Sequence, residues 1–278
     1  MKGTVKVDQL LSRLASLDSL LVAFSGGADS AFLLAAATKA LGSRRVAAAT
    51  ALSPSLPEAE VAAARDFAAE LGVRHYLPET NELQREGYRR NAGDRCFFCK
   101  TELMSVLGPL AESEGFAHIA TGTNADDTVA GFRPGIRAGV NAGALIPLAD
   151  AELTKDEVRA QSREWGLRTW DKPAAACLSS RIAYGIEITP SHLARVGQAE
   201  ADLRDALRRH DIPVRNLRVR DMGDDSARVE IDAELVSELE TRPDVLDSVV
   251  GFTSVTVDPQ GFRSGAMNEL LADPARYR

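Results

Sequence analysis

Residues 20–30, Leu-Leu-Val-Ala-Phe-Ser-Gly-Gly-Ala-Asp-Ser, are the stretch that decides the fold. Residues 20–24 form a short apolar run that ends at a serine and two glycines, which predicts a buried strand followed by a tight turn. The alanine- and leucine-rich sequence that follows predicts a helix that begins near Asp29. A strand, a glycine turn and a helix in this order form one unit of an α/β fold.

The glycine turn also predicts a binding site for an anion. Gly26 and Gly27 have no Cβ, so successive backbone N–H groups can approach a ligand, and the following helix presents the positive end of its dipole. The sequence is neither the G-x-x-x-x-G-K-[ST] phosphate loop nor the G-x-G-x-x-G motif. An ordinary glycine-rich turn is the alternative, but Ser25, Asp29 and Ser30 around the glycines favour a phosphate site.

Alternation of strands and helices continues along the chain. Strands are expected at 46–50, 74–77 and 118–121, with a short one at 146–148, and helices lie between them, which predicts a doubly wound, mainly parallel sheet. From residue 187 the pattern changes to a long charged helix and two half-polar strands joined through Gly223-Asp224-Asp225. We therefore expect an α/β domain over residues 1–186 and a small α+β domain over residues 187–278.

Composition excludes several classes of function. The chain has 278 residues and a formal net charge of −7, which argues against binding of nucleic acid, because phosphate contacts require a basic surface. The sequence has no apolar run of 18 residues and no signal-like start, so we expect a cytoplasmic protein without a membrane partner. Three cysteines suit metal or thiol chemistry in a reduced compartment better than a disulfide framework.

The cysteines are Cys96 and Cys99 in a C-x-x-C pair, and Cys177 after three alanines. The pair alone is compatible with a redox site, half of a zinc site or part of an iron–sulfur site. Three thiolates would leave one iron of a cubane cluster open to an exogenous sulfide. The alternative for Cys177 is a buried small hydrophobic residue, and spacing alone does not bring the three sulfurs together.

Asp126 and Asp127 follow the expected strand at 118–121 in the sequence Gly-Thr-Asn-Ala-Asp-Asp. Acids at the start of a helix are favoured by its dipole, so capping is one interpretation. The other is that this loop reaches the same sheet edge as the glycine turn and holds magnesium or the nucleotide, since Mg²⁺ binds carboxylates together with phosphate oxygens.

These motifs together resemble those of one family. Ser25 to Ser30 is similar to the S-G-G-x-D-S signature of the PP-loop ATP pyrophosphatases, whose fold is like that of the adenine nucleotide alpha hydrolases. The chain resembles the LarE family within that superfamily, and the matching pieces run through the whole expected α/β domain. They are Ser25 to Ser30, Asp94 to Lys100, Gly122 to Asp127 with Arg133-Pro134-Gly135, and Lys172 to Arg181 with Tyr184-Gly185 and Ile188-Thr189.

The resemblance implies an ATP-dependent sulfurtransferase that matures the nickel-pincer nucleotide of lactate racemase. ATP would adenylate a carboxylate of pyridinium-3,5-biscarboxylic acid mononucleotide, and a soft sulfur nucleophile would then displace AMP to give a thiocarboxylate. The family uses two sulfur sources. Either three cysteines carry a [4Fe–4S] cluster with a spare sulfide, or one cysteine gives up its own sulfur. Cysteine at all three positions, 96, 99 and 177, favours the cluster, and sacrificial Cys177 is the alternative.

Roles for individual residues follow from the resemblance and from their places at strand ends. We expect the ATP phosphates on Ser25, Gly26, Gly27, Asp29 and Ser30, with Asp29 acting through Mg²⁺. Ala23 and Thr50 would line the adenosine, and Thr123 and Asp126 would approach from the later loop. Ser180 and Arg181 would hold the activated substrate or AMP. Arg218 and Arg220 would bind the substrate phosphate, oriented by Glu200, unless they form a solvated strand face.

Other readings remain open at this point. An ammonia-using enzyme like NAD or GMP synthetase would explain the glycine turn but not Cys177. A tRNA thiolase conflicts with the acidic charge, and a non-catalytic nucleotide- or metal-binding regulator would not need Asp29, Ser30 and Asp127 beside three cysteines. The resemblance also implies a homo-oligomer with a substrate-binding or oligomerisation role for residues 187–278, and it does not identify the sulfide donor.

Overall fold

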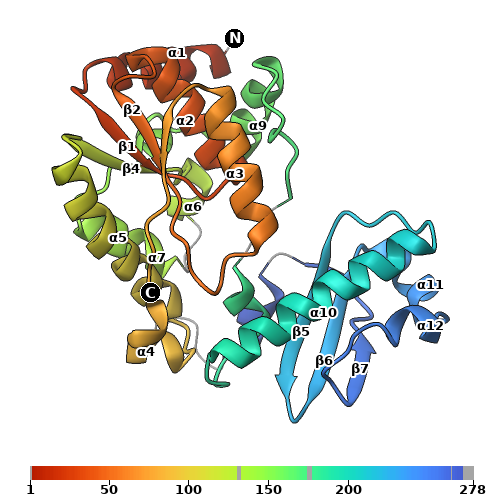
Figure 1. Ribbon diagram of the computed structural model, residues 1–278. Helices are drawn as coiled ribbons and strands as arrows, with labels where there is room; N and C mark the ends of the chain where they lie inside the picture. The colour runs from red at the N-terminus through yellow and green to blue at the C-terminus, as the bar shows by residue number, and fades with distance from the viewer. Residues whose placement is uncertain (1, 130–132, 174–176, 264, 272–278) are drawn as a thin grey trace. The chain divides into compact units, whose positions relative to one another are not determined.

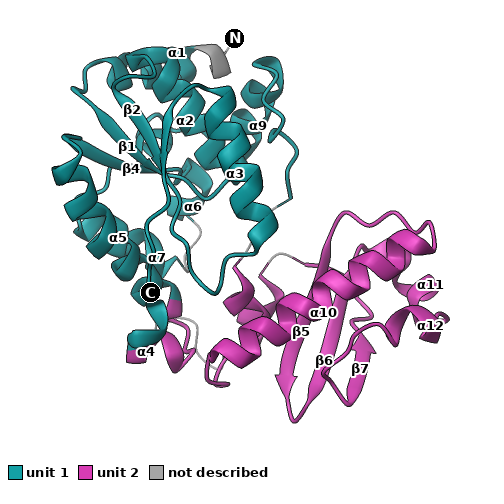
Figure 2. Ribbon diagram, in the orientation of Figure 1, with its two compact units in different colours: residues 1–85, 96–175, 277–278 teal, residues 86–95, 176–276 magenta. Residues whose placement is uncertain are grey.

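The computed structural model describes residues 2–129, 133–173, 177–263 and 265–271, which form two compact units. Figure 1 shows their elements, and Figure 2 colours the units separately. Unit 1 consists of residues 2–85 and 96–173, and unit 2 of residues 86–95 and 177–271, counting described residues only. The alanines at 174–176 of the Lys172 to Arg181 motif lie outside the described residues.

Unit 1 is built on a sheet of four parallel strands in the order β3-β2-β1-β4. The strands are β1 (Leu20–Ala23), β2 (Val46–Ala49), β3 (Arg74–Tyr76) and β4 (His118–Thr121). Leu20 lies between Val46 and His118, so the first strand is central. The predicted parallel α/β sheet is confirmed in this unit.

Helices cover both faces of this sheet, as the doubly wound pattern requires (Figure 1). Side chains alternate along each strand. Leu20 and Val22 pack in the same core as α2 (Ala28–Leu41), whereas Leu21 packs against Leu107 of α5 (Arg95–Ser113). The other helices of unit 1 are α1 (Lys2–Ala15), α3 (Glu58–Glu70), α6 (Ala125–Val129), α7 (Pro134–Asn141), α8 (Pro147–Asp150) and α9 (Lys155–Glu164), with the short 3₁₀ helix η1 (Glu82–Gln84).

The strand expected at 146–148 was wrong. Pro147 instead occupies the first position of α8, where a missing N–H costs nothing and the fixed φ suits a helix. Only a single bridge from Leu145 to Ala120 extends the sheet here. Thr154 and Glu157 form a capping box at the start of α9.

Unit 2 contains a three-stranded sheet in the order β5-β6-β7 and one long helix. The strands are β5 (Leu217–Gly223), β6 (Ser226–Ile231) and β7 (Ser254–Val257), and the long helix is α10 (Pro190–Arg209). Asp224 and Asp225 both have positive φ, the conformation of a two-residue hairpin turn, as the sequence predicted. Short helices complete the unit: α4 (Glu86–Arg89), η2 (Leu178–Arg181), η3 (Ala233–Leu235), α11 (Val236–Glu240), α12 (Pro243–Leu246) and η4 (Ala266–Leu270).

The expected domain boundary at residue 186 falls inside unit 2. The reason is Asn91, whose buried amide donates to the carbonyls of Ile182, Ala183 and Ile186 at 2.9–3.2 Å. Arg95 adds a 2.9 Å bond to the carbonyl of Ser179. These side-chain hydrogen bonds join residues 86–95 to the segment that follows Cys177. No local sequence pattern predicts them.

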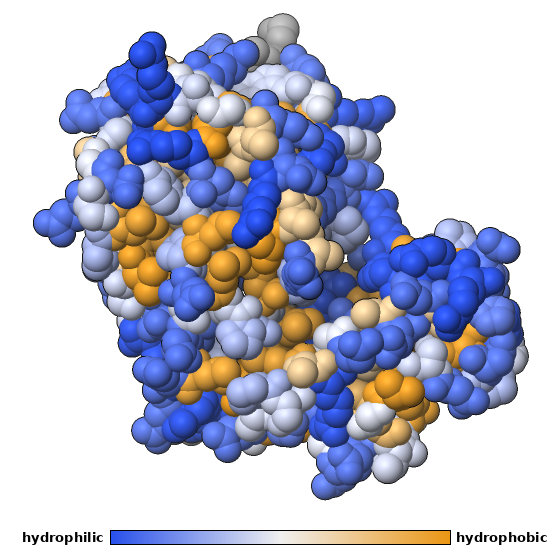
Figure 3. Space-filling view, viewed as in Figure 1, coloured by the Kyte–Doolittle hydropathy of each residue, from blue (hydrophilic) through white to orange (hydrophobic). Residues whose placement is uncertain are grey.

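The surface mixes apolar and polar side chains. In the space-filling view of unit 1, apolar side chains gather over α5 and the middle of the visible face, with hydrophilic ones around them (Figure 3). Among the described residues, no helix combines the length and the apolar character needed to cross a bilayer.

Candidate functional site

A pocket of about 310 Å³ lies at the carboxyl edge of the unit 1 sheet. Loops from β1, β2 and β4 meet there because the carboxyl ends of parallel strands share one edge. The expected residues Ala23, Ser25, Gly27, Asp29, Ser30, Thr50 and Thr123 all line it. Gly26 and Asp126 are not among the described lining residues, whereas Phe24, Lys100, Thr121 and Asp127 are.

The glycine loop supplies backbone donors to this pocket. Gly26 has φ of +72°, a left-handed conformation that favours glycine, and Gly27 is the N-cap of α2. The first helical bond runs from the N–H of Ala31 to the carbonyl of Gly27, so the N–H groups of residues 28–30 have no partner within the helix. Ser25 Oγ and Ser30 Oγ lie 3.2 Å apart beside them. This arrangement suits an anion.

Gly122 explains how the loop after β4 can lie so close to the first turn of α2. A Cβ on this residue would lie 2.7 Å from the backbone nitrogen of Ser30 and 2.8 Å from its Cα. Only glycine therefore allows the loop to rest on the first turn of α2. The contact holds Thr123 and Asp127 beside the glycine loop, as the motif had suggested.

Three acids have different surroundings at this edge. Burial raises the pKa of Asp29, with Lys155 and Asn124 acting in the opposite direction, and its Oδ1 is buried without a hydrogen-bond partner among described residues. Asp127 lines the pocket and pairs with Arg133 at 3.4 Å. Asp126 instead accepts the N–H of Lys155 at 2.8 Å, which caps α9. Asp29 and Asp127 are thus the two carboxylates at the pocket.

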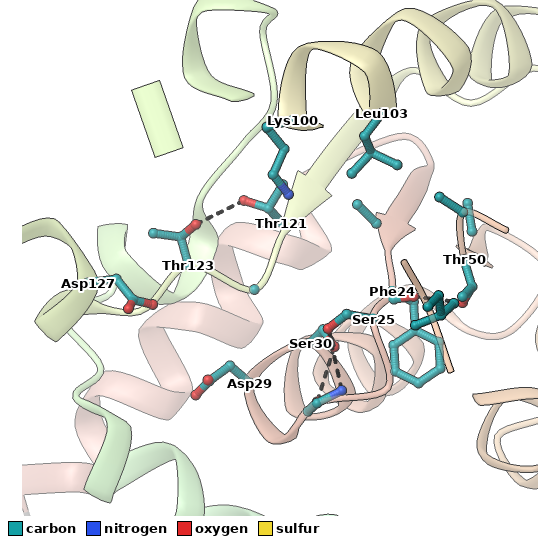
Figure 4. A pocket seen from close by; sticks show the side chains of 16 residues that line it. Phe24, Ser25, Asp29, Ser30, Thr50, Lys100, Leu103, Thr121, Thr123 and Asp127 are labelled. Carbon is teal, nitrogen blue, oxygen red and sulfur yellow. Dashed lines mark hydrogen bonds between the residues drawn. The ribbon is translucent and has the colours of Figure 1, made fainter. Parts of the chain in front are cut away.

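Lys100 is one of the lining residues that our assignment of roles missed. It extends from α5 on the side of the pocket opposite Ser25 and Ser30 (Figure 4). Burial lowers the pKa of its amine, while the nearby Cys96 and Cys99 act to raise it. The sequence signal was its place at the end of the Asp94 to Lys100 motif.

Thr50 is held within the pocket wall by two hydrogen bonds. Its hydroxyl donates to the carbonyl of Phe24 at 2.6 Å and lies 2.8 Å from Nε2 of His75. A hydroxyl has one proton, so Nε2 of His75 must be the donor and the neutral ring carries its proton there. Burial lowers the pKa of His75, which favours this neutral form.

Cys96 and Cys99 lie in the first turns of α5 and belong to unit 1, whereas Cys177 belongs to unit 2. Cys96 is exposed, and Cys99 and Cys177 are partly buried. Within either unit, the described residues contain no group of three or more His, Cys, Asp or Glu side chains that would hold a metal ion. The three-cysteine cluster stays a prediction.

Cys177 is the N-cap of η2 and the centre of a polar cluster in unit 2. Its Sγ lies 2.9 Å from Ser179 Oγ. Its carbonyl accepts from Ser180 Oγ at 2.7 Å and from Nη1 of Arg181 at 3.1 Å. The expected pair Ser180 and Arg181 therefore shapes the backbone that presents the thiol.

Glu200 orients Arg181, and its charge also acts on Arg218. It binds Arg181 in bidentate fashion at 2.7 and 3.0 Å and also accepts the N–H of Val219, on an edge strand, at 3.0 Å. A bidentate carboxylate pair fixes the plane of the guanidinium. Arg181 is thereby held on the cysteine loop.

Arg218 and Arg220 are both buried, so the solvated strand face was wrong. Arg220 donates to the carbonyl of Ser180 at 2.7 Å and pairs with the buried Glu230 at 2.6 Å. Burial and the neighbouring Arg181 lower the pKa of Arg218 to about 10, and Arg220 adds to the effect. Glu200 opposes this shift, and Glu200 and Glu230 balance part of the positive charge of the three arginines. Buried guanidinium groups are donors that suit an anion.

Comparison with known proteins places the chain in a family. Over 265 residues, 94% of this chain and 93% of the relative, it is 33% identical to pyridinium-3,5-bisthiocarboxylic acid mononucleotide synthase of Lactiplantibacillus plantarum. The chain belongs to the LarE family. An uncharacterised Synechocystis protein is 39% identical over 96% of this chain and 98% of its own length. An uncharacterised Methanocaldococcus jannaschii protein is 23% identical over 95% of this chain. No model of a protein family matched.

The LarE-family motifs fall on both units of the structure. Ser25 to Ser30 and Gly122 to Asp127 form the pocket of unit 1. Residues 177–181, with Glu200, Arg218 and Arg220, form the polar cluster of unit 2. Parts of the motifs that resemble the LarE family thus line the pocket of unit 1 or build the polar cluster of unit 2.

Proposed function

We propose that the protein is an ATP-dependent sulfurtransferase of the PP-loop type. It adenylates a carboxylate of pyridinium-3,5-biscarboxylic acid mononucleotide and converts it to a thiocarboxylate, with release of AMP and pyrophosphate. The observation that carries the proposal is the near full-length match to a synthase of the bisthiocarboxylic acid mononucleotide. The anion cradle of unit 1 supports the ATP-dependent step.

The ATP phosphates bind at the glycine loop. The amides of Gly27 and of residues 28–30, together with Ser25 and Ser30 hydroxyls, donate to phosphate oxygens. Asp29 and Asp127 would hold Mg²⁺, which stabilises the charge of the departing pyrophosphate. The orphaned Oδ1 of Asp29 fits this role, because a bound cation would satisfy it. The amine of Lys100 faces the same pocket and suits a phosphate oxygen.

Substrate binds through its phosphate at the arginine group of unit 2. Burial is the main cause of the lowered pKa of Arg218, with Arg181 adding to the effect and Glu200 opposing it, and a bound phosphate would favour the charged guanidinium. Arg181, fixed by Glu200, holds the backbone of Cys177 and would keep the thiol in position. The nucleotide substrate is therefore recognised by charge at buried guanidinium groups.

The sulfur comes from a [4Fe–4S] cluster on Cys96, Cys99 and Cys177. Two thiols one helical turn apart at the start of α5, one of them exposed, fit two corners of such a cluster. When bound, the cluster would supply a soft sulfide as nucleophile. Sacrifice of the sulfur of Cys177 is the alternative source.

Pyrophosphate release tests the function. Purified protein with ATP and Mg²⁺ should release pyrophosphate only when pyridinium-3,5-biscarboxylic acid mononucleotide is present, because the carboxylate is the group adenylated. Nicotinic acid mononucleotide, which has a single carboxylate, serves as the comparison for selectivity. Release that does not depend on either nucleotide, or no release at all, would contradict the proposal.

A further inference from the structure

The amine of Lys172 binds the glycine loop from outside the pocket. Nζ donates to the carbonyl oxygen of Gly26 at 3.0 Å and to Oε2 of Glu60 at 2.6 Å. Lys172 follows α9 in the chain and Glu60 lies in the first turn of α3. The glycine loop and the start of α3 therefore share one donor, the amine of Lys172.

This contact sets the direction of a donor inside the pocket. The carbonyl of Gly26 and the N–H of Gly27 belong to one planar trans peptide, so they point in opposite directions. Gly27 lines the pocket and Gly26 is not among the described lining residues. With its carbonyl held by Lys172, the peptide directs the Gly27 N–H to the pocket side, where it lies 3.4 Å from Ser25 Oγ. That long distance leaves the N–H available to a stronger acceptor.

Because residue 26 is a glycine, a contact is needed to hold the orientation of the Gly26–Gly27 peptide. Gly26 has φ of +72° and no side chain, so its peptide has more rotational freedom than any other residue would give. A flipped peptide would turn the carbonyl dipole toward the pocket and repel an anion. Lys172 opposes that flip with a charged hydrogen bond.

Lys172 is itself fixed in place. Its carbonyl accepts from Nη2 of Arg159 on α9 at 3.1 Å, and its N–H donates to the carbonyl of Thr169 at 3.1 Å. Its side chain is 21% exposed and that of Glu60 24%. The carboxylate of Glu60 balances the charge of the amine, which keeps Lys172 on the loop rather than in the pocket.

We propose that Lys172 is a positioning residue of the phosphate-binding loop. It acts through the Gly26–Gly27 peptide and orders a backbone donor for the ATP phosphates, without touching them. The inference rests on the proposed function, in which that loop binds ATP.

The test compares the affinities for ATP and for adenosine, measured by calorimetry on the full chain. Lys172→Met should weaken ATP binding about tenfold, the worth of one charged hydrogen bond. Adenosine binding should stay unchanged, because the nucleoside does not use the loop amide. Lys172→Arg, which keeps a charged donor, should recover most of the ATP affinity.

Lys6→Met is the matched control. Lys6 makes the same two kinds of contact, at 2.8 Å to the carbonyl of Glu152 and 2.9 Å to the carboxylate of Glu157, with 27% exposure. Lys6→Met should lower the stability in thermal unfolding about as much as Lys172→Met does, and it should leave the affinity for ATP unchanged.

Two results would overturn the inference. The first is the absence of an ATP-specific loss in Lys172→Met: either ATP affinity is unchanged, or ATP and adenosine lose affinity equally, as a general structural role predicts. The second is tighter ATP binding in Glu60→Gln, which would show that a released Lys172 binds phosphate directly; positioning predicts weaker binding in that variant. Failure of the unaltered protein to bind ATP would instead contradict the proposed function.

Discussion

The carboxylate of Asp29 lies in the first turn of α2, where one oxygen has no hydrogen-bond partner among the described residues. Its raised pKa shows that burial disfavours the charged form more than the nearby cations favour it. A buried carboxylate of this kind lowers the stability of the folded protein. Such destabilising groups occur mostly at functional sites. Asp29 is therefore the residue at which stability and the proposed chemistry oppose each other.

Replacing Asp29 by Asn should raise stability and remove activity. The free energy of unfolding should increase by about 1 kcal/mol at neutral pH, since a buried charge is removed. Pyrophosphate release should fall at least about 100-fold because the magnesium ligand is lost. Thermal unfolding and a pyrophosphate assay measure the two effects.

The stability gain of Asp29→Asn should also depend on pH. The folded pKa lies above the ordinary value of 3.8, so the folded state holds the proton more tightly than the unfolded state. The cost of the charge is fully present above the folded pKa and disappears as pH falls toward 3.8. The difference between variant and parent should therefore close in acid, and a constant difference would contradict the assignment.

Sequence patterns located the polar side chains around the glycine loop but only part of the residues that line the pocket. Ser25, Asp29, Ser30 and Thr50 could be predicted because each follows a strand whose end faces one sheet edge. Lys172 and Glu60 could not, since Lys172 binds Gly26 and Glu60, each of which is more than 100 residues away from it in the sequence. Such contacts depend on how helices pack and leave no local signal.

At the scale of elements, the amino end of α2 and the loop after β4 form one assembly. They are in contact through Gly122, whose missing Cβ lets backbone meet backbone. Elements with strong local patterns, such as β1 and α10, were predicted from the sequence. The short segment at 146–148 was not, because an apolar run that contains a proline fits an edge strand and a helix start equally well.

Gly122→Ala should therefore disturb this assembly. Its Cβ would press on the backbone of Ser30, and we expect a loss of about 2 kcal/mol in the free energy of unfolding, with weaker ATP binding. Gly108→Ala is the control, because Gly108 lies within α5 with open space around its Cβ position. Because Pro109 follows it and restricts a residue with a Cβ, Gly108→Ala should change the free energy of unfolding by no more than about 0.5 kcal/mol. Equal effects in urea unfolding would contradict the close approach.

At the scale of the whole molecule, the thiols are divided between two units, with Cys96 and Cys99 in one and Cys177 in the other. The sequence showed that the chain has an α/β part and an α+β part, but it placed residues 86–95 with the former. The side chains of Asn91 and Arg95 reverse that assignment through hydrogen bonds to residues 179–186.

Single replacements of the cysteines separate the two sulfur sources. Cys177→Ser should keep pyrophosphate release and lose thiocarboxylate formation at least about 100-fold, because adenylation needs no thiol. Cys96→Ser and Cys99→Ser should lose the product equally if a cluster carries the sulfide. They should retain it if Cys177 is sacrificed, with product measured by mass spectrometry. Product formation by Cys177→Ser would contradict both routes.

The most direct measurement is the product of one turnover by anaerobically purified protein, with ATP and pyridinium-3,5-biscarboxylic acid mononucleotide. High-resolution mass spectrometry of the nucleotide, with AMP and pyrophosphate measured in the same sample, follows both halves of the reaction. We predict that one sulfur replaces one oxygen of a carboxylate and that AMP and pyrophosphate appear in equal amounts. A nucleotide that remains a carboxylate or becomes an amide while ATP is consumed would contradict the account.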